Sequence, residues 1–559
     1  MTFRYRFVLF FFIILFLAVI MRLFYWQVVR ASELAAMGEA QYGRSILLNP
    51  TRGQIFTSDH FSIAANKLSY LVFANPKEVT DIAAQSAQLA RLLDVDQASV
   101  SAVLSLDRFW VPIKNNVDRK TKEAIEPLKL PGVGFQEQYV RYYPEASMAA
   151  KLLGFVGKDE DGADKGYFGL EGYYDRQLRG KEGRSVEIRD ALGQPIVARM
   201  NDAPGKVDGR NLILHVDRTI QFLLDQELQD GVERYGAEGG MAVVMDPKTG
   251  GILAMSAFPT YDPRSYREYS DDLYRNPIIT DTYEPGSTFK PLVMASALDA
   301  GLIKPDTKCD ICDGPVQIGE YAIKTWNGKY TANQTMTEVI QHSDNTGMVF
   351  VGRKLGLDRM LGYFEKFGIG DTTGIDLQGE VEASIRDRDA WYPIDAATAT
   401  FGQGITVTPI ELITAFTAIA NEGKRMEPHV VASIETPDGD IITIPPKMLS
   451  RPISEKAAKV MTEMMVNAVD EGEAKWAKPK GYRIAGKTGT AQIPVEGHYD
   501  ADKTIASFIG FAPADDPKFL MLVVYDRPST SIYGSETAAP TFFRVAKNIL
   551  LHYDIPPTE

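Results

Sequence analysis

The sequence predicts an α+β protein of more than one domain that is attached to a membrane by one N-terminal helix. The chain opens with an apolar stretch long enough to span a bilayer. β-Type runs occur at both ends of its second half, and helical segments lie between those runs. Strands do not alternate with helices as in a doubly wound parallel sheet. We therefore expect one antiparallel sheet of five strands with helices on its faces.

The composition is that of a folded protein that does not bind nucleic acid. The 559 residues suffice for roughly two to four domains, and ordinary hydrophobic (45%) and charged (24%) fractions exclude wholesale disorder. A net charge of −13 without any basic block argues against general nucleic-acid binding. The six histidines show no metal-ligand spacing, so we expect no metal, and we expect no cofactor.

The two cysteines, Cys309 and Cys312, form one Cys-x-x-Cys pair. Such a pair could be a tight disulfide, half of a zinc site or two thiols. Zinc is the least favoured because no second pair or nearby histidine accompanies it. We interpret the pair as structural or incidental, with its redox state open.

A membrane anchor is expected at Phe7–Val29. This stretch is almost wholly apolar and would rise about 34 Å as a helix, with Arg22 placed to reach the headgroups. Arg4 and Arg6 precede it without an acidic residue, which favours residues 1–6 as a short cytoplasmic tail. A cleaved signal peptide is the alternative, but the long run and its aromatic flank favour a retained single span.

Residues 30–205 mix short strand-like and helical pieces and show no spacing of a nucleophile with a base. Strands are expected at Ile46–Leu48, Tyr70–Phe73 and Ser185–Ile188, and a helix at Thr80–Leu93. We interpret Arg52, Arg141 and Glu171 as members of buried structural ion pairs, and the domain as non-catalytic. The polar, turn-rich segment Asp202–Gly209 predicts the domain boundary.

The second domain, residues 206–559, should contain the five-stranded sheet. A strand at Leu212–His215 opens it, and the sheet strands are expected at Met241–Met245, Ile252–Ser256, Tyr482–Gln492, Ala506–Ala512 and Phe519–Tyr525. Capping boxes at Thr335–Glu338 and Thr408–Glu411 predict two helix starts. Further helices are expected at Arg218–Tyr235, Met348–Leu355, Ser454–Val469 and Pro540–Leu551.

A candidate nucleophile lies in Tyr283–Pro291, where a Pro-Gly turn delivers Ser287 to the expected first turn of a helix. Lys290 follows three residues later and so shares its helix face. A neutral, buried amine can take the proton of a serine hydroxyl and make it nucleophilic. The alternative is an N-terminal serine cap with a solvated lysine one turn on.

Two further motifs favour the catalytic interpretation. Ser343-Asp344-Asn345 lies in a polar turn between two expected helices, and Lys487-Thr488-Gly489-Thr490 lies in an expected strand. A Ser-x-Asn can be an ordinary helix cap. A glycine inside a strand, as at Gly489, indicates close approach of another backbone or of a ligand.

In this order the motifs resemble those of the penicillin-binding serine acyltransferases, Ser-x-x-Lys, Ser-x-Asn and Lys-[Thr/Ser]-Gly. Arg52-Gly53, Tyr143-Pro144 and Gly169-Leu170-Glu171, behind an anchor, resemble the pedestal of class B penicillin-binding proteins. Phe401–Pro409 resembles the septal, cell-division branch more than the elongation branch. The resemblance implies an elongated α+β pedestal of the penicillin-binding protein dimerisation type, followed by a serine β-lactamase-like transpeptidase domain.

The resemblance also implies a role for each motif residue. Ser287 would attack a stem peptide ending in D-Ala-D-Ala and form an acyl-enzyme. Lys290 would be the base, kept neutral by burial and by Lys487 as a second cation. Ser343 would relay the proton to the leaving amine, and Asn345 would hold the substrate amide or Lys290.

Substrate binding is assigned by the same resemblance to the third motif. Thr488, Gly489 and Thr490, with the nearby lysine of that motif, would bind the terminal carboxylate. The backbone N–H groups of Ser287 and Thr490 would form the oxyanion hole. An amine of a second stem peptide would then resolve the ester, and β-lactams would acylate the same serine.

Location and partners follow from the resemblance and the anchor. We expect a single-pass protein of the cytoplasmic (inner) membrane with its catalytic domain on the periplasmic or extracellular side. A polytopic glycosyltransferase and other division proteins are the expected protein partners.

Several alternatives stay open beside a septal transpeptidase. An elongation-type enzyme would differ in partners, and a D,D-carboxypeptidase or serine β-lactamase would resolve the ester with water. The only lactamase-like Glu-x-x-x-Asn spacing between the second and third motifs, Glu463–Asn467, falls inside an expected helix and is interpreted as coincidence. A β-lactam sensor would need a cytoplasmic domain, and an idle scaffold would be expected to lack a motif residue.

Overall fold

The computed structural model describes residues 2–34, 37, 43–189, 195–199, 205–495 and 498–557. By its internal contacts the chain divides into two compact units. One consists of Met1–Arg52 with Arg179–Gly209, and the other of Gly53–Leu178 with Arg210–Glu559. Residues 202–204 of the expected domain boundary lie outside the described residues.

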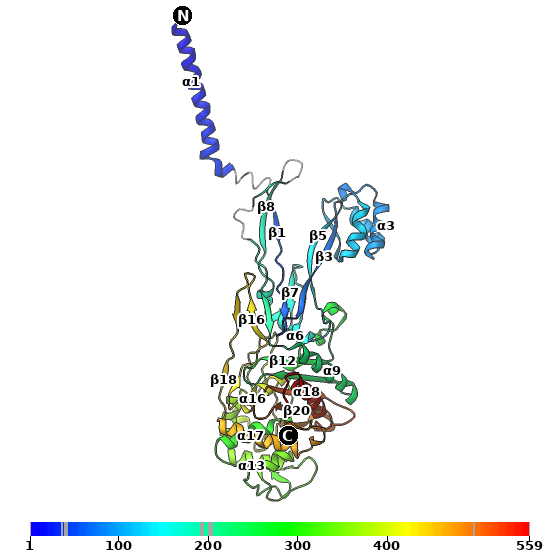
Figure 1. The fold of residues 1–559 in the computed structure, drawn as a ribbon, viewed down its shortest axis with the longest axis vertical. Coiled ribbons are helices and arrows are strands. Elements are labelled where there is room, and N and C mark those ends of the chain that lie inside the picture. The colour runs from blue at the N-terminus through cyan, green and yellow to red at the C-terminus, as the bar shows by residue number, and fades with distance from the viewer. Residues whose placement is uncertain are drawn as a thin grey trace. The chain divides into compact units, whose positions relative to one another are not determined.

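The first unit holds the N-terminal helix and a small antiparallel sheet (Figure 1). Helix α1 (Thr2–Phe24) continues into a π-helical turn, Tyr25–Val29. The segment Phe3–Val29 has a mean hydropathy of 3.0 and is long and apolar enough to cross a membrane. The sheet order is β1 (Gly43–Leu48), β8 (Gly183–Arg189) and β9 (Pro195–Arg199). The two strands expected at 46–48 and 185–188 therefore pair with each other.

A five-stranded antiparallel sheet lies in the second unit, as predicted. Its order is β12 (Ile252–Phe258), β11 (Gly239–Met245), β21 (Phe519–Asp526), β20 (His498–Ala512) and β19 (Ala485–Val495). The early hairpin joins the late strands through β11 and β21, where Val243 lies opposite Leu522. Strand β19, which carries the Lys-Thr-Gly-Thr motif, is at an edge of the sheet.

Both faces of this sheet are buried, because alternate residues of a strand point to opposite sides. On β21, Leu520 and Leu522 belong to one core cluster, whereas Met521 and Val523 belong to the other. Helices α9 (Arg218–Tyr235) and α18 (Ala538–His552) pack on the Met521 side. The nearly continuous apolar sequence of β21 follows from burial on both faces.

The other face is covered by a helical layer that holds the first two motifs. Its members are α11 (Lys290–Asp299), α12 (Met336–Gln341), α13 (Asn345–Leu355), α14 (Leu357–Phe367), α15 (Pro393–Ala399), α16 (Pro409–Ala420) and α17 (Glu455–Asp470). Both predicted capping boxes are present, with Thr335 and Glu338 opening α12 and Thr408 and Glu411 opening α16. Every residue of α16 is buried, as expected for a helix that is apolar all round.

A second, seven-stranded sheet combines segments from both halves of the chain. Its order is β17 (Ile441–Thr443), β16 (Val431–Glu435), β10 (Asn211–Leu214), β2 (Ile55–Phe56), β3 (Ser62–Ala74) and β4 (Val111–Val117), with β5 (Val133–Tyr142) paired to β3. Strand β10 runs parallel to β2, and the other pairs are antiparallel. The strand expected to open the second domain thus lies beside first-domain strands.

Helices α3 (Ile82–Leu93), α4 (Gln97–Leu104) and α5 (Arg119–Ile125) pack on β3 and β4 to form a small lobe with its own core. Short elements complete the second unit: α6 (Ala150–Leu153), β6 (Phe155–Lys158), β7 (Asp164–Tyr167), α7 (Gly169–Tyr173), α8 (Asp175–Leu178), α10 (Pro277–Thr280), β13 (Val316–Ile318), β14 (Tyr321–Ile323), β15 (Arg425–Met426) and β18 (Met448–Ser450). Figure 1 shows α3 beside β3 and β5.

The predicted buried ion pair joins β5 to α7. Arg141 Nε donates to Glu171 Oε1 at 2.6 Å, and both side chains are almost fully buried. Arg141 Nη1 also donates to the carbonyl oxygen of Gly53 at 2.7 Å. The prediction is wrong in one respect, because Arg52 is only half-buried. The long stem of an arginine lets its charged head stay near water.

Candidate active site

The serine of the first motif sits in a 3₁₀ turn, Gly286–Phe289, immediately before α11. The sequence predicted a first α-helical turn here. Proline at position 291 explains the difference, since it has no N–H to donate to the Ser287 carbonyl. The N–H of Lys290 makes that bond instead, at the shorter 3₁₀ spacing. Ser287 is half-buried at this turn.

Lys290 is fully buried, and its amine is directed to the second motif. Nζ donates to the Ser343 carbonyl at 2.5 Å, to Asn345 Oδ1 at 2.8 Å and to Ser343 Oγ at 3.2 Å. Within the described chain these are its acceptors, and Ser287 Oγ is not among them. Burial first, and the Lys487 charge second, hold the pKa of Lys290 well below its usual range.

Ser343 connects the two lysines. It lies between α12 and α13 with φ +56°, a left-handed conformation that is uncommon for serine and costs free energy. Its Oγ accepts from Lys487 Nζ at 2.9 Å and faces Lys290 Nζ at 3.2 Å. One hydroxyl thus lies between two buried amines. Burial also lowers the pKa of Lys487, to about 8.

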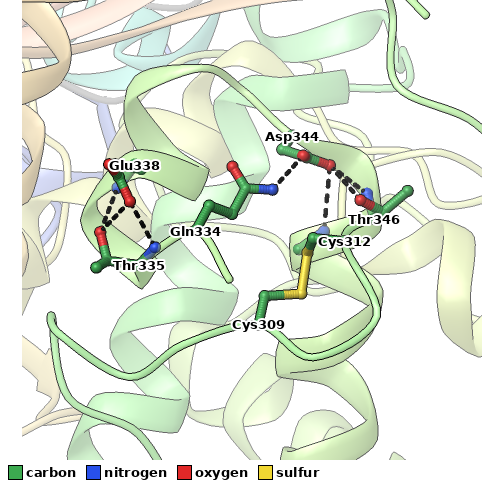
Figure 2. The surroundings of a disulfide bond; sticks show 8 residues. Cys309, Cys312, Gln334, Thr335, Glu338, Asp344 and Thr346 are labelled. Carbon is green, nitrogen blue, oxygen red and sulfur yellow. Dashed lines mark hydrogen bonds between the residues drawn. A yellow bond between two sulfur atoms is a disulfide. The ribbon is translucent and has the colours of Figure 1, made fainter. Parts of the chain in front are cut away.

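Asp344 holds the turn in this conformation. Its Oδ1 accepts from Thr346 N at 2.7 Å, Thr346 Oγ1 at 2.6 Å and Gly347 N at 3.2 Å, which caps α13. Its Oδ2 accepts from Gln334 Nε2. Figure 2 shows Asp344 at the centre of these bonds. Both carboxylate oxygens of Asp344 are thus hydrogen-bonded, which holds the turn in which the preceding residue, Ser343, is left-handed.

A disulfide between Cys309 and Cys312 lies next to this support (Figure 2). The N–H of Cys309 donates to the carbonyl oxygen of Gln334 at 2.9 Å. The same Gln334 reaches Asp344 through its side chain. Of the three interpretations open from the sequence, the structure has the disulfide, and it braces the second motif.

The third motif packs directly on the turn that carries the nucleophile. A Cβ at Gly489 would lie 2.8 Å from the Thr288 methyl carbon and 2.3 Å from Ser507 Oγ. The groups that approach this glycine closely are two side chains rather than the backbone or ligand that the sequence predicted. Thr490 Oγ1 accepts from the Gly534 N–H at 3.1 Å, which fixes its side chain.

The segment Phe401–Pro409 supports the same turn from another side. The N–H of Gly286 donates to the Gly402 carbonyl at 2.9 Å, and a Cβ on Gly402, where φ is +77°, would lie 2.2 Å from the Gly286 oxygen. Gly404 N–H donates to Glu284 Oε1 at 3.0 Å. Glycine is therefore required at Gly402 by both its φ and its contact.

The structure brings together all the predicted site residues from three separate parts of the chain. It adds two groups that sequence reasoning passed over, namely Asp344 and Gln334. Asp344 could have been recognised as the N-cap of the helix that follows the motif. Gln334 belongs to no motif, and only its contacts with Asp344 and Cys309 reveal it.

The arrangement suits acyl transfer. A neutral amine can accept a hydroxyl proton, and a hydroxyl shared with a second amine can pass a proton on. Among the residues that the structure describes, no three histidine, cysteine, aspartate or glutamate side chains gather in a way that could hold a metal ion.

Comparison with known proteins places the chain in a family. A model of the penicillin-binding protein transpeptidase domain matches residues 240–550, and a model of the penicillin-binding protein dimerisation domain matches residues 47–214. The chain is 34% identical to stage V sporulation protein D of Bacillus subtilis, over 99% of this chain and 86% of that protein. The chain belongs to the class B penicillin-binding proteins. The resemblance inferred from the motifs is confirmed.

Other relatives of this penicillin-binding protein are named as transpeptidases. It is 31% identical to the probable peptidoglycan D,D-transpeptidase PenA of Neisseria meningitidis, covering 100% of this chain and 94% of the relative. It is 30% identical to the peptidoglycan D,D-transpeptidase FtsI of Escherichia coli, covering 96% and 89%.

Solved structures show the same fold over most of the chain. A peptidoglycan synthetase from Bifidobacterium adolescentis matches with a TM-score of 0.74 and 27% identity, covering 92% of this chain and 98% of that one. Penicillin-binding protein 3 of Mycobacterium tuberculosis, complexed with aztreonam, matches with a TM-score of 0.72 and 25% identity over the same shares.

Proposed function

We propose that this penicillin-binding protein is a peptidoglycan D,D-transpeptidase with Ser287 as its nucleophile, acting in septal cell-wall synthesis. One observation carries the reaction assignment: two buried amines, Lys290 and Lys487, share the Ser343 hydroxyl beside the turn that holds Ser287. The names of the relatives from Neisseria meningitidis and Escherichia coli support the same reaction.

Acylation begins when Ser287 Oγ attacks the carbonyl carbon of the penultimate D-alanine. Its proton passes to neutral Lys290 Nζ, and the backbone N–H groups of Ser287 and Thr490 stabilise the oxyanion. As the C–N bond breaks, the Lys290 proton reaches the leaving amine through Ser343 Oγ. The terminal D-alanine departs, and the remaining stem peptide is held as an ester on Ser287.

Deacylation reverses the proton path. An amine of a neighbouring stem peptide attacks the ester carbonyl and gives up one proton, and Ser287 Oγ recovers a proton as the ester C–O bond breaks. The product is the cross-linking amide. Attack by water would release a carboxylate instead, as in a carboxypeptidase.

The substrate carboxylate is assigned to the third motif. The hydroxyls of Thr488 and Thr490, with the Lys487 ammonium, would bind it. Gly489 between them leaves room for Thr288 and Ser507 to pack against the strand. β-Lactams would acylate Ser287 from the same pocket. Complexes of penicillin-binding protein 3 of Mycobacterium tuberculosis with aztreonam and ampicillin support this ligand class.

Labelling with a fluorescent penicillin tests the nucleophile. Ser287→Ala is expected to abolish the covalent label. Ser296→Ala is the matched control, because Ser296 is a buried serine of α11, the helix after the Ser287 turn, and its hydroxyl donates to the Leu292 carbonyl of that helix. Persistent labelling of Ser287→Ala at the same peptide, found by mass spectrometry, would remove Ser287 from this role.

Septal placement is supported by the resemblance of Phe401–Pro409 to the division branch. A fluorescent fusion expressed at native level is expected to gather at mid-cell during division. Labelling along the side wall throughout growth would indicate the elongation-type role instead.

The membrane topology is assigned from Phe3–Val29 and from Arg4 and Arg6 before its core. Residues 1–6 would be cytoplasmic, and the catalytic domain would lie on the periplasmic or extracellular side. Protease added outside spheroplasts should degrade the catalytic domain, while a domain protected until lysis contradicts this topology.

A polytopic glycosyltransferase of the division machinery is assigned as the membrane partner. The anchor and the pedestal support this choice. A polytopic partner could contact the anchor inside the bilayer and the pedestal outside it. Purification in mild detergent followed by mass spectrometry should recover such a protein. Its absence under conditions that keep known membrane complexes intact would count against the partner.

A further inference from the structure

Glu473 lies in the segment that follows α17, between the two structures that carry Ser343 and Lys487. The carbonyl oxygen of Glu471 accepts from Gln341 Nε2 at 3.4 Å, and Gln341 ends α12, two residues before Ser343. On the other side, the Val469 side chain is 3.2 Å from the Cβ position of Gly486, the neighbour of Lys487 in β19. The end of α17 and the segment after it thus contact a neighbour of Ser343 in the chain and a neighbour of Lys487.

One carboxylate oxygen of Glu473 has no hydrogen-bond donor. Oε1 is buried from solvent and accepts no hydrogen bond from any described residue. A buried acceptor without a partner costs about 1–3 kcal/mol, and more when it is charged. Such an atom calls for a compensating interaction.

The charges around the Ser343 hydroxyl indicate which groups could compensate the unpaired Glu473 oxygen. Lys290 and Lys487 are 0% and 3% exposed, and both contact Ser343 Oγ, so a proton on either amine is a buried positive charge. A buried charge is strongly unfavourable without a counter-charge. Asp344, the other carboxylate of the cluster, already accepts four hydrogen bonds from its own turn and from Gln334.

The remaining charged groups of these elements are exposed or already paired, as Asp470 is with Lys478 and Glu338 with the Thr335 N–H. His342 at the end of α12 is exposed, as are Glu471 and Lys475 in the segment after α17. Glu473 acts on the pKa of both amines, whereas Asp344 and Lys487 act on that of Lys290. The Glu473 charge raises the pKa of both lysines, against the lowering effect of burial.

We infer that Glu473 is a positioning residue that keeps one proton on the amine pair and holds it on Lys487. Lys290 then stays neutral as the base while Lys487 stays charged for the carboxylate and the relay. This inference rests on the proposed function, since it assigns opposite protonation states to the two lysines. None of the three motifs contains the residue.

The test is the pH profile of the second-order rate of acylation by a fluorescent penicillin, measured on the full-length protein in detergent. The wild-type rate should rise as Lys290 loses its proton and fall as Lys487 loses its own. Glu473→Gln is expected to move the falling limb to lower pH by about one unit, a roughly tenfold loss of rate above that limb. Glu473→Asp keeps the carboxylate charge, so its falling limb should return most of the way to the wild-type position.

Glu471→Gln is the matched control, because it removes an exposed carboxylate two residues away from the same segment. Its profile should superimpose on the wild type. A uniform loss of rate in Glu473→Gln with both limbs unmoved would overturn the inference, as would an unchanged profile. If Glu473→Gln fails to fold, a Glu473→Asp variant whose falling limb moves to lower pH by a full unit, although the carboxylate is kept, would overturn it. A wild type that is not labelled at Ser287 would instead refute the proposed function.

Discussion

At the scale of single residues, the site depends on groups held in unfavourable states. Ser343 adopts a left-handed conformation, and Lys290 is an amine buried without exposed surface. Both states are stabilised by neighbours, since Asp344 caps the turn that presents the Ser343 oxygen atoms to Lys290. Backbone strain and burial of this kind occur at active sites, where an amine must stay neutral and a side chain must keep one orientation.

Replacing Lys290 by alanine separates its chemical role from any structural one. Lys290→Ala should slow penicillin acylation by roughly 100- to 10,000-fold, the usual contribution of a general base. The variant should still fold, because removing a buried amine also removes its desolvation cost. Stopped-flow acylation and a thermal melt measure the two effects. Near-normal acylation would move the base role to another group.

At the scale of elements, short segments fix the positions that catalysis needs. The 3₁₀ turn exists because Pro291 has no N–H for the Ser287 carbonyl, and the Cys309–Cys312 disulfide braces the turn before α13 through Gln334. A close histidine pair links β10 to the start of β16, with His215 Nε2 and His429 Nε2 3.0 Å apart.

The disulfide should contribute modestly to the free energy of unfolding. Its larger effect should be on the rate of acylation. It closes a loop with a sequence separation of only three, so its loss should cost about 2 kcal/mol of unfolding free energy in the chain-entropy account. We expect the double variant Cys309→Ser/Cys312→Ser to lose that much in a denaturant titration. We also expect it to acylate more slowly, since Gln334 is less firmly held. A variant with full acylation rate would show that the brace is not needed.

The histidine pair predicts an acid-sensitive junction. Burial, and then the neighbouring His429, lower the pKa of His215 from 6.5 to about 4, with Asp246 opposing. Between these values the unfolded chain binds a proton that the native His215 does not, so stability falls as the pH falls through this window. His215→Gln should flatten the melting temperature between pH 6.5 and 4, while exposed His342→Gln should not. Equal slopes in both variants would contradict the assignment.

At the scale of the whole molecule, the second unit does not separate into an early and a late half. The seven-stranded sheet places β2 and β3 beside β10, β16 and β17, which come from the other side of the residues 179–209. Damage to early strands should therefore reach the site.

Glu171→Ala tests this coupling. Removing one partner of the buried pair with Arg141 should cost about 3–5 kcal/mol, because the other charge stays buried. We expect penicillin labelling at Ser287 to disappear at the same lowered temperature as the circular dichroism signal. Labelling that survives the loss of the early strands would show that the two parts unfold separately.

The sequence predicted much of this fold because its signals are local. Period-2 apolar runs, capping boxes and the anchor depend on neighbours within a few residues, so the five strands and the helix starts at Thr335 and Thr408 lie close to their expected places. The partner of Leu212–His215 was not predicted, because strand pairing across the chain leaves no local trace.

The same division holds for the site. By itself the sequence determined the three motifs, their order and the need for a glycine at Gly489, since each depends on residue type and spacing. Only the tertiary structure decided that Lys290 is held by Ser343 and Asn345, that the cysteines brace this turn, and that Glu473 Oε1 is buried without a hydrogen-bond partner. Protonation depends on burial and on charges brought from distant segments, and these exist only once the chain has folded.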